Sequence, residues 1–282
     1  MQIIPSSANE FEQLKKFLIP HERMCVQLSS YVRKNRNDIF LIKDDDEICG
    51  AFYANGTFLH CIPDFAKRAG EFSQILGNFL LTHAVKCVNG ELTVSEFIKP
   101  LVQYTKTSGE NSIHQTNRYK LMCLAPEDAL IPPSEPLQPC DEIRRMANPE
   151  HDAEILFDLQ KHYIMEEVAP AGKTTGDLEI SVILKQILKN QICLTLFSDG
   201  EPVAKANTNA IGWNCVQLGG VYTNPLYRRN SYAYHLVYCL CSRILRTGRT
   251  VTLYVKEKNT PALELYKKLG FKECGYYSIT YL

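Results

Sequence analysis

The second half of the chain begins with two stretches in which apolar residues recur at helical spacing. Asn148-Pro149 predicts the start of the first helix, because Asn is a good cap and proline suits the first turn. A loop over 169–176 follows, and Asp177 is expected to cap the second helix. The expected apolar faces are Ile155, Leu156, Leu159 and Tyr163 on the first helix, and Ile180, Ile183, Leu184, Ile187 and Leu188 on the second.

Strand and helix patterns alternate over the rest of this half. Asp199-Gly200 joins two strands and suits a two-residue type I′ turn. Gly219-Gly220 lies late in a third strand, where a bulge could sit. The expected elements are strands over 191–198, 201–209 and 214–223, a helix over 231–247, a strand over 250–255, a helix over 259–269 closed by Gly270, and one or two strands over 271–282.

The first half shows a similar order of elements. Segment 37–42 (NDIFLI) aligns with 190–195 (NQICLT), which suggests a tandem duplication of element order rather than of residues. The alternation of strands and helices predicts an α/β fold in both halves. The expected elements are helices over 9–18, 22–34, 65–83 and 92–106, and strands over 38–43, 47–53, 56–61, 85–88 and 119–125.

A proline-rich stretch separates the two halves. Five of the 14 prolines fall between Pro126 and Pro139, and proline continues neither a helix nor a central strand. This stretch is therefore expected to be an extended linker. The predicted organisation is a domain over 1–125, a linker over 126–140 and a second domain over 141–282.

The composition argues against a nucleic-acid-binding, membrane or secreted protein. With 31 basic and 31 acidic residues among 282, the net charge is zero, which argues against broad electrostatic capture of nucleic acid or of an anionic membrane. No apolar run reaches membrane-spanning length, and residues 1–14 lack the basic start and apolar core of a signal peptide. A cytoplasmic protein with neither a nucleic-acid nor a membrane partner is expected.

The cysteines point the same way. They number 11, an odd count, and stand singly in apolar contexts such as Cys87 and Cys193, so buried free thiols are expected rather than a disulfide framework. Cys239 and Cys241 fall on an expected helix, where residues two apart face away from each other. No metal is expected, because Cys-x-x-Cys and His-x-x-x-His spacings are absent from the sequence.

The stretch from Leu218 to Phe271 carries the candidate chemistry. A strand ending in LGGVYTNP leads through YRRNSYA into a helix. A strand-to-helix turn directs several backbone N–H groups and the positive end of the helix dipole at one point, an anion site suited to a pyrophosphate. Arg228 and Arg229 add positive charge that can pair with phosphate oxygens.

This half resembles the GNAT N-acetyltransferase superfamily over residues 140–282. The family's phosphate motif, [Q/R]-x-x-G-x-[G/A], is matched by Arg228-Arg229-Asn230-Ser231-Tyr232-Ala233, with Ser231 in place of the central glycine. A second block, N-x-x-A-x-x-x-Y-x-x-x-G-F, is matched in full by Asn259, Ala262, Tyr266, Gly270 and Phe271. The resemblance implies tandem domains, each with a mixed, mostly antiparallel sheet flanked by helices.

The resemblance also implies a mechanism, in which acetyl-CoA is a cosubstrate and an amine of a small molecule or peptide accepts the acetyl group. The Val221 N–H would polarise the thioester carbonyl, and Val221, Tyr222 and Thr223 would hold the pantetheine arm. Asn259 would bind the pantetheine amides, or it would simply cap a helix. Tyr266 would donate to the leaving thiolate, or it would simply be a core aromatic beside Ala262.

The general base is not evident from the sequence. The family's usual position lies on the strand with Cys215 and Gln217, which carries no carboxylate here; His162, Glu166 and Glu167 are weaker candidates. Two alternatives to an enzyme of this kind stay open. One is a coenzyme-A-binding regulatory protein without catalysis, and the other is a tandem acyl- or aminoacyl-transferase with a bulkier donor.

Three further features bear on ligand binding. The triplet 172–174 (GKT) is not expected to form a P-loop, because its preceding glycine is missing. A basic cluster of Arg243, Arg246 and Arg249 is expected to be a solvated helix end, with coenzyme phosphate as the alternative partner. At the matching loop of the first half, Glu71 and Phe72 are unsuited to phosphate, so this half is expected not to bind coenzyme A.

Overall fold

The computed structural model describes residues 1–104, 115–168 and 174–282, and two compact units are distinguishable within it. Unit 1 comprises Met1–Leu121, Val255–Lys258 and Glu273–Leu282, and unit 2 comprises Met122–Tyr254 and Asn259–Lys272. Residues 172 and 173 of the GKT triplet, the end of the helix predicted over 92–106 and most of the loop predicted over 169–176 lie outside the described residues.

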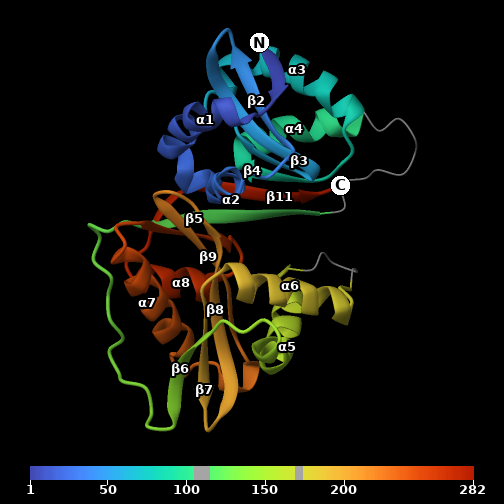
Figure 1. The fold of residues 1–282 in the computed structure, drawn as a ribbon. Coiled ribbons are helices and arrows are strands. Elements are labelled where there is room, and N and C mark those ends of the chain that lie inside the picture. The colour runs from blue at the N-terminus through green and yellow to red at the C-terminus, as the bar shows by residue number, and fades with distance from the viewer. Residues whose placement is uncertain (105–114, 169–173) are drawn as a thin grey trace. The chain divides into compact units, whose positions relative to one another are not determined.

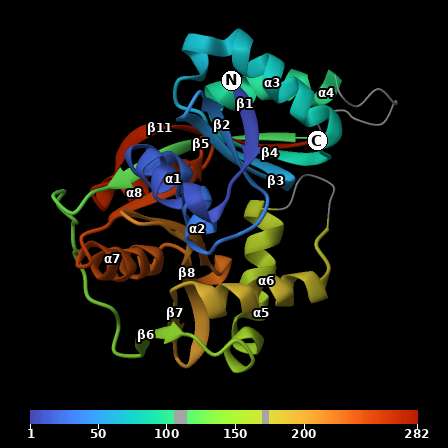
Figure 2. The same ribbon diagram turned by 45° about the horizontal axis from the view of Figure 1, so that its top comes forward.

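Unit 1 is a sheet with helices on both sides. Its strand order is β1-β2-β3-β4-β11-β5, in which β3 and β4 are parallel, whereas the β1–β2, β2–β3 and β4–β11 pairs are antiparallel. Figures 1 and 2 show α1 and α2 on one side of β2 and β3, with α3 and α4 on the other. The elements are β1 (Gln2–Pro5), η1 (Ala8–Glu10), α1 (Phe11–Leu18), η2 (Ile19–His21), α2 (Glu22–Arg33), β2 (Ile39–Asp44), β3 (Glu47–Cys61), η3 (Phe65–Arg68), α3 (Ala69–Thr82), β4 (Val85–Glu91), α4 (Leu92–Tyr104), β5 (Gln115–Leu124) and β11 (Lys272–Tyr281).

Unit 2 likewise consists of a mostly antiparallel sheet with helices on both sides. Its order is β10-β9-β8-β7-β6, antiparallel throughout except for the parallel β9–β10 pair. Figures 1 and 2 show α7 on one side of β7 and β8, and α5 and α6 on the other. The elements are β6 (Asp141–Met146), α5 (His151–Tyr163), the π-helical turn η4 (Ile164–Val168), α6 (Asp177–Asn190), β7 (Cys193–Ser198), β8 (Glu201–Ile211), β9 (Cys215–Thr223), η5 (Pro225–Tyr227), α7 (Tyr232–Leu245), β10 (Thr250–Lys256) and α8 (Thr260–Lys268).

Each unit has its own apolar core. In unit 1, Phe52, Phe58 and Phe72 are fully buried, and Phe52 stacks on Phe58 with ring centroids 4.6 Å apart. Burying one such side chain contributes about 1.5–3 kcal/mol relative to leaving it exposed. In unit 2, Leu156 of α5 and Leu184 of α6 are fully buried against β7 and β9, as their helical spacing predicted.

Several predicted local features are confirmed. Asp199 and Gly200 have φ values of +51° and +84°, as a type I′ turn requires. Asn148 Oδ1 accepts hydrogen bonds from the N–H groups of Glu150 and His151 immediately before α5, although Glu150 rather than Asn148 occupies the cap position. Residues 125–140, which include the stretch predicted as a linker, contain no helix or strand.

Other predictions were wrong. The predicted strands over 47–53 and 56–61 form the single strand β3, whose first part pairs with β2 and whose later part pairs with β4. The edge strands β1 and β6 were not predicted, because β1 has only four residues and β6 is mostly polar. Asp177 is the first residue of α6 rather than its cap, and Gly176 occupies the cap position.

The tail forms a strand, as predicted, but its grouping and the state of two cysteines differ from the predictions. The tail forms one strand, β11, which pairs antiparallel with β4, so Glu273–Leu282 group with unit 1 rather than with the second half of the chain. Nine cysteines are free, as expected, but Cys123 and Cys274 are disulfide-bonded. The partner of β11 is not signalled by spacing, because β4 is far from it in the sequence.

Candidate active site

The parallel strands β9 and β10 pair over only part of the length of β9. Their register runs from Cys215–Thr250 to Leu218–Leu253, and β9 then continues to Thr223. Beyond Leu218, therefore, the side of β9 that faces β10 is not paired with it. A free strand edge of this kind can bind an extended ligand through main-chain hydrogen bonds.

A bulge lies in the same part of β9, as the glycine pair predicted. Lys205 of β8 is opposite Tyr222, whereas Asn207 is opposite Gly219, so Gly220 and Val221 together face a single residue of β8. Gly220 has φ +59°, a left-handed conformation that glycine adopts without strain. The bulge thus sets the direction of the peptide between Gly220 and Val221.

The loop after β9 leads directly into α7. Arg229 and Ser231 both have left-handed backbones, with φ +71° and +58°. In the described part of the chain, the N–H groups of Arg229, Asn230 and Ser231 donate to no backbone carbonyl. The first-turn N–H groups of α7 have no intrahelical acceptor either, since the first bond is from His235 N to Ser231 O. This cluster of unpaired donors at a helix N-terminus is suited to an anion.

The side chains of this loop have varied surroundings. Ser231 is exposed and its hydroxyl makes no capping bond, whereas the Asn230 amide donates to Tyr227 O. The buried Tyr232 hydroxyl donates to Asp141 Oδ1 at 3.2 Å, and Ala233 is half-buried in the first turn of α7. The backbone N–H groups of this loop, rather than its side chains, are therefore the donors left available to an external acceptor.

Arg228 is held by a carboxylate of η4. Its Nη2 atom lies 2.9 and 2.7 Å from the two carboxylate oxygens of Glu166, and its Nε donates to Thr223 O at 3.1 Å. Both partners of this ion pair are 43% exposed, so the pair contributes at most about 1 kcal/mol to stability. A phosphate could replace Glu166 as the partner of Arg228 at small cost.

Helix α8 carries the second block of the motif. Asn259 caps this helix, because its Oδ1 accepts from Ala262 N at 3.1 Å, and its Nδ2 donates to Glu167 Oε1 at 3.2 Å. Tyr266 is 7% exposed and its ring meets Phe271 edge-on at 5.7 Å. Burial, with Tyr163, Cys241 and Glu167 nearby, raises the pKa of Tyr266 well above its usual value, so the phenol stays protonated at neutral pH.

Lys205 is a residue of this site that the sequence reasoning missed. It is 1% exposed, and its Nζ donates to Gly220 O at 3.0 Å and to Asn207 Oδ1 at 3.3 Å. The Nζ atom also lies 4.8 Å from the ring centre of Tyr163. Burial lowers the pKa of Lys205 to about 8. The available signal was a single lysine within the otherwise uncharged run PVAKANTNA.

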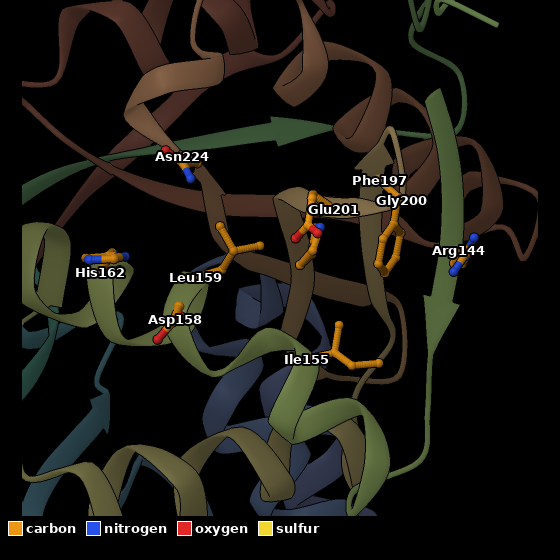
Figure 3. Close-up of a pocket in the computed structure, with 10 residues that line it drawn as sticks. Arg144, Ile155, Asp158, Leu159, His162, Phe197, Gly200, Glu201 and Asn224 are labelled. Atoms are coloured by element: carbon orange, nitrogen blue, oxygen red, sulfur yellow. The ribbon is translucent and has the colours of Figure 1, made fainter. Parts of the chain in front are cut away.

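The three candidate general bases lie in different surroundings. Glu166 is paired with Arg228, and Glu167 accepts from Asn259. His162 is exposed and lines a surface cavity of about 560 Å³ together with Asp158 of the same helix and Glu201 of β8 (Figure 3). Across this cavity, Arg144 lies 4.4 Å from the ring centre of Phe197.

The three arginines at the end of α7 differ in their exposure to solvent. Arg243 and Arg246 are exposed, in agreement with a solvated helix end. Arg249 is half-buried instead, and its Nε donates to Trp213 O at 3.0 Å. This hydrogen bond ties Arg249 to the turn before β9.

The corresponding loop of unit 1 has different chemistry. Arg68 forms ion pairs with both Asp44, at 2.8 Å, and Glu71, at 2.7 Å, so carboxylates already neutralise its charge. Phe72, where the motif has a small residue, is fully buried in the core. Among the described residues, no cluster of histidine, cysteine or carboxylate side chains could hold a metal ion, and no helix is long and apolar enough to cross a membrane.

Known proteins resemble this chain in fold. Residues 200–278, from β8 into β11, match the FR47-like protein family. No curated protein matches the sequence. A Drosophila protein of solved structure superposes with a TM-score of 0.71 at 16% identity, covering 99% of this chain and 98% of its own.

Two further solved structures identify that fold. A GNAT-family acetyltransferase from Colwellia psychrerythraea superposes with a TM-score of 0.59 at 13% identity, covering 100% of this chain and 99% of its own. A tandem GNAT protein from the clavulanic acid biosynthesis pathway superposes with a TM-score of 0.57 at 12% identity, covering 99% and 97%. Since these likenesses extend over both halves, the chain has the α/β fold of the tandem GNAT N-acetyltransferases.

Proposed function

We propose that this protein transfers an acetyl group from acetyl-CoA to an amine of a small molecule or peptide, using a site in unit 2. The observation that carries the proposal is that three features adjoin one another in unit 2: the free edge of β9, the loop that follows it, and helix α8. The unpaired edge and bulge of β9 lead into a loop of unpaired N–H groups at the start of α7, and α8 adds the buried Tyr266.

Each part of the site would have a definite role. Backbone groups of Val221, Tyr222 and Thr223 would bind the pantetheine arm as an added strand. The loop from Arg228 to Ala233 would bind the pyrophosphate, with Asn259 and Ala262 beside the arm on α8. For Arg228 to contact phosphate through its guanidinium, its ion pair with Glu166 would have to open.

The reaction would be a direct transfer. The neutral amine attacks the thioester carbonyl carbon, the oxygen gains negative charge beside the Val221 N–H, and the C–S bond then breaks. The nitrogen gives up one proton to solvent water, and the departing sulfur takes the electron pair of the C–S bond as a thiolate. Since the raised pKa of Tyr266 makes its proton costly to release, this hydroxyl would stabilise the thiolate chiefly by donating a hydrogen bond to it.

The test is a turnover assay that detects free thiol, with acetyl-CoA and a panel of small amines and peptides. Thiol release that depends on an amine, together with acetylated product by mass spectrometry, is the expected result. Calorimetric titration with coenzyme A provides the matched binding measurement. Coenzyme binding without turnover on any amine would instead favour a regulatory coenzyme-A-binding protein, a reading also compatible with Glu166 and Glu167 both being engaged.

A further inference from the structure

A buried cation lies at the bulge of β9, directly beside the proposed acyl site. The Lys205 side chain is 1% exposed, and its Nζ donates to the carbonyl oxygen of Gly220 at 3.0 Å. Nζ also donates to Asn207 Oδ1 at 3.3 Å and lies over the face of the Tyr163 ring. Because an uncompensated buried charge is very costly, these contacts are needed to keep the amine in place.

The acceptor of this hydrogen bond belongs to the same peptide group as the Val221 N–H. A trans peptide is planar, so the Gly220 C=O and the Val221 N–H point in opposite directions. Lys205 therefore fixes the orientation of the Val221 N–H through the carbonyl. A donor on the carbonyl oxygen also polarises the peptide, which makes its N–H a stronger donor in turn.

We propose that Lys205 is a positioning residue that orients and polarises the Gly220–Val221 peptide, so that the Val221 N–H stabilises the developing oxyanion of an acyl thioester. This inference rests on the proposed function. Gly220 is part of the arrangement, since a Cβ atom there would lie 1.9 Å from Asn207 Oδ1 and 3.0 Å from Lys205 Nζ. The contacts of Lys205 with Gly220 and Asn207 therefore require a glycine at position 220.

The geometry favours this role over that of a general base. A base must present a lone pair to the incoming amine, whereas Lys205 Nζ is directed as a donor at two acceptors within the protein. An ammonium held in this way at neutral pH polarises the peptide more strongly than a neutral donor would. Replacement by a neutral side chain should therefore weaken the transition-state contact while leaving coenzyme binding nearly intact.

The test compares Lys205→Met and Lys205→Gln with a matched control, Thr195→Val. Thr195 lies opposite Lys205 on β7 and its hydroxyl is buried, so this control removes a neighbouring polar atom without touching the peptide. The measurements are kcat, KM, the dissociation constant for coenzyme A, and the carbonyl resonance of bound acetyl-CoA labelled with carbon-13 at the carbonyl.

We expect Lys205→Met to lower kcat by roughly tenfold to a hundredfold and to change the dissociation constant less than about threefold, since it weakens rather than removes an oxyanion donor. The bound carbonyl resonance should move toward its position in free acetyl-CoA. Lys205→Gln, which retains a neutral donor, should fall between Met and the wild type. Thr195→Val should behave as the wild type does.

Two results would overturn the inference. One is a Met variant that binds coenzyme A normally and keeps both the wild-type kcat and the wild-type resonance. The other is a loss of kcat that a weakly basic acceptor amine restores while the resonance is unchanged, which would assign Lys205 as the base. If the wild type binds acetyl-CoA without transferring it, the proposed reaction fails, and the resonance still tests the peptide polarisation by itself.

Discussion

Ser231 combines a left-handed backbone with a position at the start of α7. Its φ of +58° disfavours any residue with a side chain, and its hydroxyl makes no compensating cap. Ser231→Gly is expected to raise the free energy of unfolding by about 1 kcal/mol and to keep or tighten coenzyme A binding. Denaturant unfolding and calorimetry would measure the two effects.

Two companion variants separate strain from chemistry at this position. Ser231→Ala keeps the strain and removes the hydroxyl, so weaker binding in this variant alone would assign the hydroxyl a phosphate contact. Ser231→Glu places a carboxylate among the unpaired N–H groups and should abolish binding. Wild-type affinity in the Glu variant would mean that the coenzyme binds elsewhere.

Tyr266 is expected to act in the transition state rather than in binding. Tyr266→Phe removes only the hydroxyl, so the buried ring should still pack against Phe271 and the thermal midpoint should barely move. Because burial raises its pKa, we expect a loss of kcat near the lower end of the roughly 10²–10⁴ that general acids supply. Steady-state kinetics under conditions where chemistry limits turnover would measure this loss. A Phe variant with wild-type kcat under those conditions would make Tyr266 a core aromatic only.

Lys205 should also leave a signature in the pH dependence of stability. Its pKa is about 8 when folded and 10.5 when unfolded, so the unfolded chain binds more protons between these values and stability rises with pH there. The cost of burying the charge, roughly 3 kcal/mol, is complete below pH 8 and is gone by about pH 10.5. Neighbouring titratable groups include Cys193 on β7, Tyr163 on α5 and Tyr222 on β9.

The measurement is denaturant unfolding of the wild type and of Lys205→Met from pH 7 to pH 10. Other groups titrate in both proteins, so their contributions largely cancel in the difference. Relative to the Met variant, the wild type should gain stability as the pH rises. A difference that stays constant over this range would mean that the buried lysine keeps an ordinary pKa.

At the scale of elements, the bulge of β9 determines where the strand edge becomes available. Gly220→Ala introduces both left-handed strain and a collision with Asn207, so it should cost roughly 2–4 kcal/mol of stability and most of the activity. Gly248, with φ +74° and open space around it, is the matched control. Gly248→Ala should cost only about 1 kcal/mol and leave activity unchanged. Equal losses of stability in the two variants, by thermal or denaturant unfolding, would contradict the close packing of the bulge.

At the scale of the whole molecule, we expect one coenzyme A per chain. The loop of unit 1 has its arginine paired with Asp44 and Glu71, and Phe72 fills the core there. Gly70→Glu, which adds a carboxylate to an exposed position in the first turn of α3, should therefore leave the affinity unchanged, in contrast to Ser231→Glu. Calorimetric titration giving two sites per chain would show that unit 1 also binds the coenzyme.

Several local features of the chain, in and near the proposed site, were determined by the sequence alone. The type I′ turn, the bulge and the cap of α8 depend on the conformations of a few adjacent residues, and Asp199-Gly200, Gly220 and Asn259 have the right chemistry for them. The order of β9, the loop, α7 and α8 is likewise local. Residues a few positions apart in one element are necessarily neighbours, so spacing is sufficient to predict them.

Only the tertiary structure decided which distant groups meet. Lys205 reaches Gly220 through the register of β8 against β9, and Glu166 reaches Arg228 from a separate turn. The return of β11 to β4 depends equally on long-range pairing. Strand register and helix packing are set by the sum of many side-chain contacts across the core, and no short segment contains that information.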